Sequence, residues 1–371
     1  MSQVRPFLAG DVAAVASLFQ KIFRDPAAPP LPGLAAYIRR LYLDTAAGKP
    51  EMPSLVHVGA AGAITGFIGV DTLTMRHGDR LLEAAICGSL MVEDHDNDPM
   101  AGARLLKAFL AGPQDISFSE TASDVSLRMW TSLRGVALPQ YSLDWVRILR
   151  PGSFLVDVAA DRLRPARLLA PFGRGLDRLA RLYQRDDAIH WSGMGAARPV
   201  PGGLDVREVD AAGFAALVEP LTEQFALRPQ WAAGQLDAIM EDARLKPSYG
   251  GQVLCAVHAR GGRPIGAFAY HVRPGGIARV LQVLARPGQA GAVIDCLIGD
   301  AFRRGAAALR GRTQPALLEA MLGRRIAFVN VASTVVHSRD GLLVEACRDG
   351  ELFFNGIAGE HWNRMIGGAF D

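Results

Sequence analysis

The sequence constrains the fold most strongly by repeating itself. Near the N-terminus, Val4-Arg5 precedes a run with apolar residues at helical spacing, and the same pattern returns 202 residues later at Val206-Arg207. In that run, the apolar positions Val12, Val15, Phe19 and Phe23 correspond to Phe214, Leu217, Leu221 and Phe225. A constant offset over several positions predicts two copies of one structural unit.

The repeated unit extends beyond its first helix. Two strands joined by a short turn are expected in 55–68 and again in 254–268. A further apolar strand follows each pair, at 84–92 and 278–285, and leads into a helix that begins with Ala-Gly-Ala. This order of elements predicts an α/β (α+β) fold with two tandem domains, each a mixed, mainly antiparallel sheet flanked by helices.

The expected domain boundaries lie on either side of a central connector. We expect an N-terminal domain at 1–156, an Arg-rich helical connector and linker at 157–203, and a C-terminal domain at 204–371. Arginines recur on one face of a predicted helix in 174–185, and the connector ends in the turn-forming run 199–203. The simplest interpretation is a connecting helix with a solvated face, although such a helix also suits a membrane surface or an anionic polymer.

Composition and charge exclude several classes of protein. Half of the residues are apolar and the net charge is +3, so the chain can bury a full core and lacks the basic excess typical of nucleic-acid binding. We find no apolar stretch long enough for a transmembrane helix and no secretory signal at the N-terminus. The four cysteines have no disulfide or metal-site spacing, so we expect a cytoplasmic protein without a metal. Its Ala, Gly and Arg content is typical of GC-rich bacterial genomes.

The Ala-Gly-Ala helix starts are the clearest chemical signal. The first turn of a helix exposes unpaired N–H groups and a partial positive charge, and small residues let an anion approach the backbone. Neither the Rossmann GxGxxG pattern nor the P-loop GxxxxGK[ST] pattern follows a strand here. A phosphate-containing ligand held by another kind of loop is therefore expected.

Taken together, these segments resemble the GNAT acyltransferase superfamily, once in each half. In that family two neighbouring strands splay apart, and a loop of the form Gln/Arg-x-x-Gly-x-Gly/Ala holds the pyrophosphate of coenzyme A. The resemblance implies cofactor contacts at Met100, Ala101, Gly102, Ala103 and Arg104 in the first half and at Gln289, Ala290, Gly291 and Ala292 in the second. It also implies that a backbone amide near Met91 or Val92 stabilises the thioester oxygen as it gains charge.

The match to this family is architectural, and single positions depart from its loop pattern. Pro99 replaces the Gln or Arg, and Arg104 replaces the second small residue. The tyrosine that often protonates the leaving thiolate corresponds to Thr131. The first-half helix is preceded by four carboxylates that would repel a pyrophosphate, namely Glu93, Asp94, Asp96 and Asp98.

Acyl transfer to an amine needs a general base, because the attacking nitrogen must be neutral. Glu120, at the end of the strand expected at 116–120, is the candidate base, with Ser119 beside it. A helix cap or a solvated strand end is the alternative role of Glu120. The run 359–362 is a second candidate for lining a site, although closing the C-terminal domain with Trp362 in its core is the simpler interpretation.

The expected function is transfer of an acetyl group or another acyl group from acetyl-CoA, or another acyl-CoA, to the amine of a small molecule or amino sugar. We expect the site in the first half, because the counterpart of Ser119-Glu120 in the second half, 310–313, offers no base. Two alternatives stay open: an aminoacyltransferase similar to the FemABX family, and a GNAT-like protein that binds without chemistry. The expected partner is a small-molecule amine and not a nucleic acid, and the oligomeric state is left open.

Overall fold

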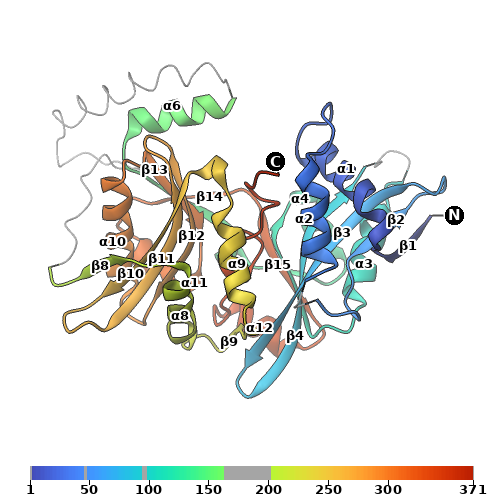
Figure 1. The fold of residues 1–371 in the computed structure, drawn as a ribbon. Helices are drawn as coiled ribbons and strands as arrows, with labels where there is room; N and C mark the ends of the chain where they lie inside the picture. The colour runs from blue at the N-terminus through green and yellow to red at the C-terminus, as the bar shows by residue number, and fades with distance from the viewer. Residues whose placement is uncertain (1, 46–47, 94–97, 163–201, 371) are drawn as a thin grey trace.

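The structure, a computed structural model, describes residues 2–45, 48–93, 98–162 and 202–370. Two β-sheets stand side by side, with helices on their faces and in the seam between them (Figure 1). Apart from one parallel neighbour pair in each sheet, the strands are antiparallel. The expected α/β fold with two mixed, mainly antiparallel sheets is confirmed.

The first part of the chain contains β1 (Gln3–Pro6), η1 (Ala9–Asp11), α1 (Val12–Phe23), α2 (Pro32–Tyr42), β2 (Leu55–Val58), β3 (Ile64–His77), β4 (Arg80–Val92), α3 (Ala101–Leu110), β5 (Ile116–Ala122), α4 (Asp124–Ser132), β6 (Val136–Ala137), α5 (Pro139–Ser142), β7 (Leu143–Ile148) and α6 (Pro151–Arg162). The second part contains β8 (Asp205–Glu208), α8 (Ala211–Thr222), β9 (Leu227–Pro229), α9 (Gln235–Arg244), η3 (Pro247–Tyr249), β10 (Gly251–His258), β11 (Pro264–Val272), β12 (Ile277–Ala285), α10 (Ala290–Arg303), β13 (Ala308–Arg312), α11 (Pro315–Met321), β14 (Ala327–Asn330), β15 (Ser333–Ser338), α12 (Gly341–Arg348) and η4 (Gly356–Ala358).

Each half of the chain sends a strand into the sheet of the other half. The first sheet has the order β1-β2-β3-β4-β5-β15-β6, with β9 attached to β3, and the second has the order β14-β7-β13-β12-β11-β10-β8. Strand β15 thus lies beside β5, and β7 lies beside β13 in the equivalent place. The boundaries 1–156 and 204–371 therefore divide the chain along its sequence, but they do not divide the strands between the two sheets. As domain boundaries they stay a prediction.

In both sheets the parallel pair separates along its length. Strands β4 and β5 pair at three positions, Ala84–Ile86 with Ile116–Phe118, and β12 and β13 pair at four, Ile277–Val280 with Ala308–Gly311. Beyond these positions the strands splay, and each first strand leads to a helix at the expected Ala-Gly-Ala start. Since backbone groups at a splay are not paired across it, each splay is a place where a ligand can reach the backbone.

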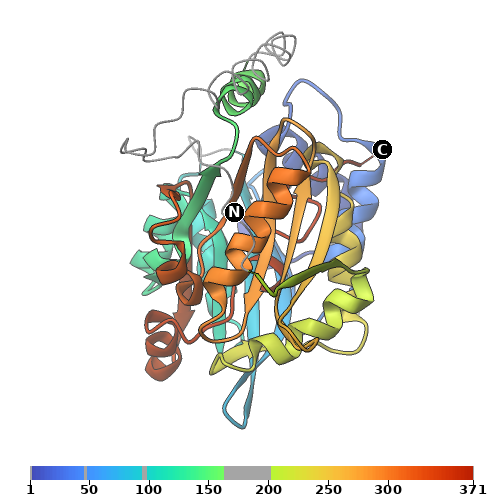
Figure 2. The same ribbon diagram turned by 90° about the vertical axis from the view of Figure 1, so that its left-hand side faces the viewer.

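The seam between the two sheets is filled by one apolar core. Helices α1 and α2 of the first half and α8 and α9 of the second contribute to it, together with side chains of the C-terminal segment 353–370. From that segment come Phe353, Ile357, Ala358, Trp362, Met365 and Phe370. On the opposite face of the second sheet lies α10 (Figure 2). Trp362 is buried as expected, but in a core that both halves share.

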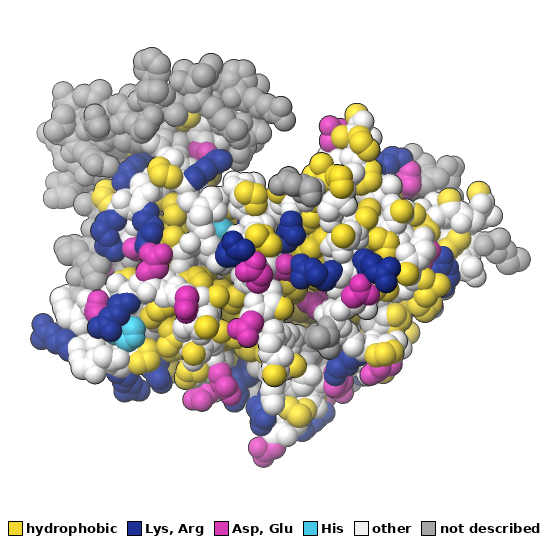
Figure 3. Space-filling model, in the orientation of Figure 1, with side chains coloured by type: hydrophobic (Ala, Val, Ile, Leu, Met, Phe, Trp, Pro, Cys, Tyr) yellow, Lys and Arg dark blue, Asp and Glu magenta, His cyan; other side chains and the backbone are white. Residues whose placement is uncertain are grey.

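Part of the connector lies outside the described residues, including its Arg-rich stretch 174–185. Within the described ranges, we find no helix with the length and apolar character needed to cross a membrane. On the face seen in Figure 3, basic and acidic side chains are interspersed, so this face carries no large patch of one sign.

The strand exchange predicts that a change in the second half destabilises the first sheet. Val336 on β15 is fully buried between Phe118 of β5 and Val136 of β6. Val336→Ala should cost about 2 kcal/mol of unfolding free energy and should speed hydrogen exchange in β5 more than in β13. Val329→Ala, at a position 43% exposed on β14, is the control. Unchanged exchange in β5 would contradict the prediction.

Candidate active site

A cavity of about 520 Å³ lies where β4 and β5 splay. Its walls come from the end of α1, from β4 and β5 beyond their last paired residues, from β7 and β13 of the second sheet, and from 360–367. These segments are far apart in the sequence, and the exchange of strands between the sheets brings them together. The cavity therefore depends on both halves of the chain.

A bulge in β4 shapes one wall of this cavity. Ser89 has a φ of +53°, which is uncommon for a residue other than glycine. The register between β3 and β4 shifts at the same place, between Phe67 and Gly69. The side chains of Ser89 and Leu90 line the cavity, and the hydroxyl of Tyr42 lies 3.3 Å from the Ser89 hydroxyl.

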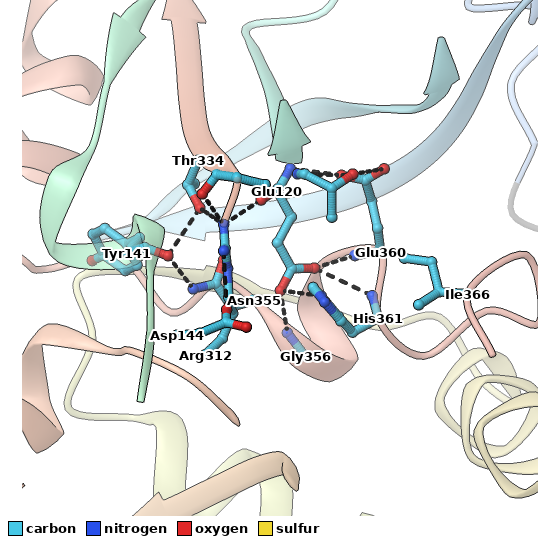
Figure 4. A network of polar contacts seen from close by, with 12 residues as sticks. Glu120, Tyr141, Asp144, Arg312, Thr334, Asn355, Gly356, Glu360, His361 and Ile366 are labelled. Atoms are coloured by element: carbon cyan, nitrogen blue, oxygen red, sulfur yellow. Dashed lines mark hydrogen bonds and ion pairs between the residues drawn. The ribbon is translucent and has the colours of Figure 1, made fainter. Parts of the chain in front are cut away.

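Glu120 on β5 is fully buried, and its carboxylate points to the C-terminal segment (Figure 4). It accepts hydrogen bonds from the amides of Gly356, Glu360 and His361 at 3.2, 2.6 and 3.2 Å. His361 Nδ1 lies 2.7 Å from Oε1, at ion-pair distance but without hydrogen-bond alignment. Burial by itself would raise the pKa of Glu120, but His361, Arg312 and the amide of Glu360 together lower it to about 2.

These contacts do not suit the general base that we expected at Glu120. Its carboxylate does not line the cavity, and a pKa near 2 leaves little tendency to take a proton. Ser119, the other expected catalytic residue, does line the cavity, and its hydroxyl donates to Glu360 at 3.3 Å. The geometry thus makes Glu120 an anchor for the segment that contains Glu360.

Glu360, unlike Glu120, lines the cavity. Its Oε2 accepts from the amides of Glu120 at 2.7 Å and Thr121 at 3.0 Å, and from the Thr121 hydroxyl at 3.2 Å. Burial, and then the negative charge of Glu120, raise the pKa of Glu360 to about 7. A cavity carboxylate that titrates near neutral pH can accept a proton from a substrate and release it again.

The second sheet contributes Arg310, Arg312 and Asp144 to the same cavity. Arg312 donates to the carbonyl of Glu120 at 2.5 Å and to Asp144 at 3.2 Å, and Arg310 Nε donates to Asp144 at 2.7 Å. We expected 310–313 only as the second-half counterpart of Ser119-Glu120. The structure instead places this strand end against the first-half site.

The expected thioester contact lies at the end of β4, at Met91 and Val92, which do not line the cavity. Met91 and Val92 are buried, so their side chains do not reach a ligand. The amide of Glu93 donates to the carbonyl of Thr65 on β3 at 2.9 Å. Because amides alternate in direction along an antiparallel strand, the amide of Val92 is directed away from β3.

The first turn of α3 contains the other expected cofactor residues, Met100, Ala101, Gly102, Ala103 and Arg104. Ala101 and Gly102 are buried, and a Cβ on Gly102 would lie 3.3 Å from Met129 Sδ on α4. The N-cap residue Met100 is 58% exposed and provides no side-chain cap. The first-turn amides therefore have no capping side chain, as an anion site requires.

Two of the four carboxylates before α3 are paired with cations. Glu93 forms an ion pair with Lys21, and Asp98 forms one with Arg104. These pairings reduce the repulsion that the carboxylates would exert on a pyrophosphate. The other two, Asp94 and Asp96, lie outside the described residues.

The expected second-half residues Gln289, Ala290, Gly291 and Ala292 begin α10, but there is little space before them. The cavity there measures about 30 Å³, enough for about one water molecule. The guanidinium of Arg324 covers the turn, since a Cβ on Gly291 would lie 2.6 Å from it. The two halves therefore differ sharply in the room they offer a ligand.

No group of three or more His, Cys, Asp or Glu side chains among the described residues is placed to hold a metal ion. All four cysteines are buried and unpaired.

The sequence matches no protein-family model and no curated protein. Solved structures do match it. A conserved protein of unknown function from Enterococcus faecalis V583, described as a probable N-acyltransferase, has a TM-score of 0.57 at 10% identity, over 91% of this chain and 73% of that one.

Two structures of GCN5-related N-acetyltransferases match similarly. The Kribbella flavida protein has a TM-score of 0.52 at 12% identity, over 92% of this chain and 72% of that one. The Anabaena variabilis ATCC 29413 protein has a TM-score of 0.57 at 9% identity, over 92% of this chain and 74% of that one. The chain has the GNAT fold. In this GNAT fold the splay of β4 and β5 is the place where the cavity opens.

The raised pKa of Glu360 predicts a decline of stability with rising pH. Its ordinary pKa is 4.5 and its folded pKa is about 7, so folding favours the protonated form and this contribution is lost as pH rises through that window. Between pH 5 and 8, the unfolding free energy of Glu360→Gln should fall by about 2 to 3 kcal/mol less than that of the unmodified protein.

Urea unfolding at both pH values measures this difference. Glu219→Gln, at an exposed position of α8, is the matched control. An unchanged pH dependence in Glu360→Gln would show that Glu360 titrates normally in the folded protein.

Proposed function

We propose that this protein transfers an acyl group, such as acetyl, from an acyl-CoA to the amine of a small molecule, at the splay of β4 and β5. The observation that carries the proposal is the 520 Å³ cavity at this splay with the carboxylate of Glu360 in its wall. The GNAT fold supports acyl transfer in general. Of the residues assigned below, Glu360 lines this cavity, whereas Val92 and Met100–Arg104 do not.

Glu360 is the proposed general base. Its pKa of about 7 lets it accept a proton from the attacking ammonium group, directly or through water. The neutral nitrogen then forms a bond to the thioester carbonyl carbon, and the carbon–sulfur bond breaks. As the amide forms, the nitrogen loses a second proton and the CoA thiolate takes one up. Glu360 then releases its proton to solvent, so that the reaction yields one proton overall.

Backbone groups supply the remaining interactions. The amide of Val92, directed away from β3, is the proposed donor to the thioester oxygen. The pyrophosphate is assigned to the first turn of α3, at Met100–Arg104, where the amides lack a side-chain cap. The described residues that line the cavity include no tyrosine, and Thr131 does not line it either, so we assign no side chain to thiolate protonation.

The second half is proposed to be non-catalytic. Its cavity of about 30 Å³ is too small for a thioester, and its wall includes Phe353 from the C-terminal segment. What the second half contributes is one wall of the first-half cavity. The proposal thus keeps the expected enzyme for the first half and assigns neither catalysis nor CoA binding to the second.

Loss of the base gives the first functional prediction. Glu360→Gln should lower kcat/KM by about a hundredfold to ten-thousandfold, because the amide cannot accept the proton, while the Kd for CoA stays nearly unchanged. Steady-state release of free CoA and calorimetry measure the two quantities, with Glu219→Gln as the control.

In the unmodified protein kcat/KM should rise with pH up to about 7. Full activity of Glu360→Gln would refute the assignment.

A matched pair of substitutions tests which half binds CoA. Ala103 and Ala292 occupy the same place in the first turns of α3 and α10, and both are half-buried. Ala103→Glu puts a negative charge beside the pyrophosphate and should weaken CoA binding roughly tenfold or more, whereas Ala292→Glu should not. Calorimetry with CoA measures both variants. The reverse pattern would place the CoA site in the second half.

A further inference from the structure

The charged groups that line the cavity differ in exposure, and the side chains of Arg312 and Asp144 are largely buried, like that of Glu360. Glu360 stands at the buried end, 4% exposed, beside the hydroxyls of Ser119 and Thr121. Arg24, exposed where α1 ends, and Arg310 on β13 line the more open part. Under the proposed function the reacting amine reaches Glu360, so the rest of the acceptor extends toward these two arginines.

Arg24 has no acidic partner among the described residues. Its guanidinium lies 5.8 Å from the centre of the Phe19 ring, and Nη2 donates to the carbonyls of Met365 and Gly368 at 3.4 and 3.3 Å. Both hydrogen bonds are long for N–H donors. Arg24 therefore brings an uncompensated positive charge and donors that a ligand can use.

Arg310 also keeps part of its charge available. Asp144 lies between Arg310 and Arg312, so one carboxylate faces two guanidinium groups. Arg312 uses its other donors on carbonyls, including those of Glu120 and Ser142 at 2.5 and 3.0 Å. The two guanidinium groups and the one carboxylate carry a net positive charge, and Arg310, whose side chain is 30% exposed, is the more accessible of the two arginines.

Apolar and polar side chains both line the rest of the cavity. Phe23, Leu90, Val331 and Met365 are the apolar part, against which a hydrocarbon spacer can pack. An acceptor with a second cation would place that cation beside Arg24 and Arg310 and be repelled. An acceptor with an anion would gain charge-assisted hydrogen bonds from both guanidinium groups.

We infer that the acceptor is an amine with an anionic group, a carboxylate or a phosphate, separated from the nitrogen by a short apolar spacer. The inference rests on the proposed acyl transfer. It names Arg24 and Arg310 as the residues that determine acceptor specificity. Amino acids and aminoalkyl phosphates belong to this class, whereas polyamines and amino sugars without an acidic group do not.

Four acceptors with a primary amine on an unbranched chain test the inference. With acetyl-CoA as the donor, kcat/KM should be roughly tenfold or more higher for γ-aminobutyrate or aminopropyl phosphate than for γ-aminobutyramide or putrescine. The two anionic acceptors distinguish a carboxylate site from a phosphate site. Equal use of the uncharged amide, or preference for putrescine, would overturn the inference.

Substitutions then assign the selectivity to the two arginines. Arg24→Gln and Arg310→Gln should each raise KM for the preferred anion roughly tenfold, with kcat and the KM for γ-aminobutyramide nearly unchanged. Arg39→Gln, on α2 with its partner Asp44 at 3.0 Å, is the control. Arg310→Lys keeps the positive charge and should lose less than Arg310→Gln. If neither glutamine variant changes KM, the inference is wrong.

A binding measurement separates failure of this inference from failure of the proposed function. If no amine is acetylated and CoA does not bind, the proposed function is wrong. Calorimetry with γ-aminobutyrate and putrescine then still tests the cavity. Binding of γ-aminobutyrate that weakens in Arg24→Gln would support an anion-selective cavity, whereas preferential binding of putrescine, or binding of neither compound, would refute it.

Discussion

The buried carboxylate of Glu120 holds the site together. It accepts a hydrogen bond from the backbone amide of Glu360, and the carboxylate of Glu360 accepts one from the backbone amide of Glu120. This exchange fixes the C-terminal segment against β5 where β4 departs. On the other side of the segment, the buried ammonium group of Lys246 donates to the carbonyls of His361 and, at 2.8 Å, Ile366. The cavity wall is therefore held by groups from both halves.

The carboxylates of Glu120 and Glu360 have different protonation behaviour because their surroundings differ. His361, Arg312 and several amides surround Glu120 and keep it ionised, whereas Glu360 faces the cavity and accepts its hydrogen bonds from hydroxyls and amides. The ionised neighbour then adds to the cost of charging Glu360, which raises its pKa further. Burial is the larger cause of the raised pKa of Glu360, and the charge of Glu120 adds to it.

The sequence allowed the sheets to be predicted better than the site. The spacing of apolar residues indicated the strand that ends at Val92 and the helix that begins at Ala101, because both signals are local. The exchange of β7 and β15 could not be predicted, since short apolar strands pair equally well in either sheet. Glu120 was identified as important from its place at a strand end, but its role depends on amides 236 to 241 residues away. The run at 359–362 carried the signal for Glu360, and nothing local placed it in the first half.

Exchange of strands also accounts for the difference between the two splays. Strand β13 lies beside β7, and its outer end, with Arg310 and Arg312, reaches the first-half cavity instead of a cavity of its own. On the second-half side the equivalent space is closed by Phe353 and by the guanidinium of Arg324 over α10. Once a strand end forms the wall of one cavity, it is no longer free to shape another. This connection of the sheets thus favours one ligand-sized cavity at the splay of β4 and β5, and under the proposed function Arg310 of the second half contributes to acceptor binding there.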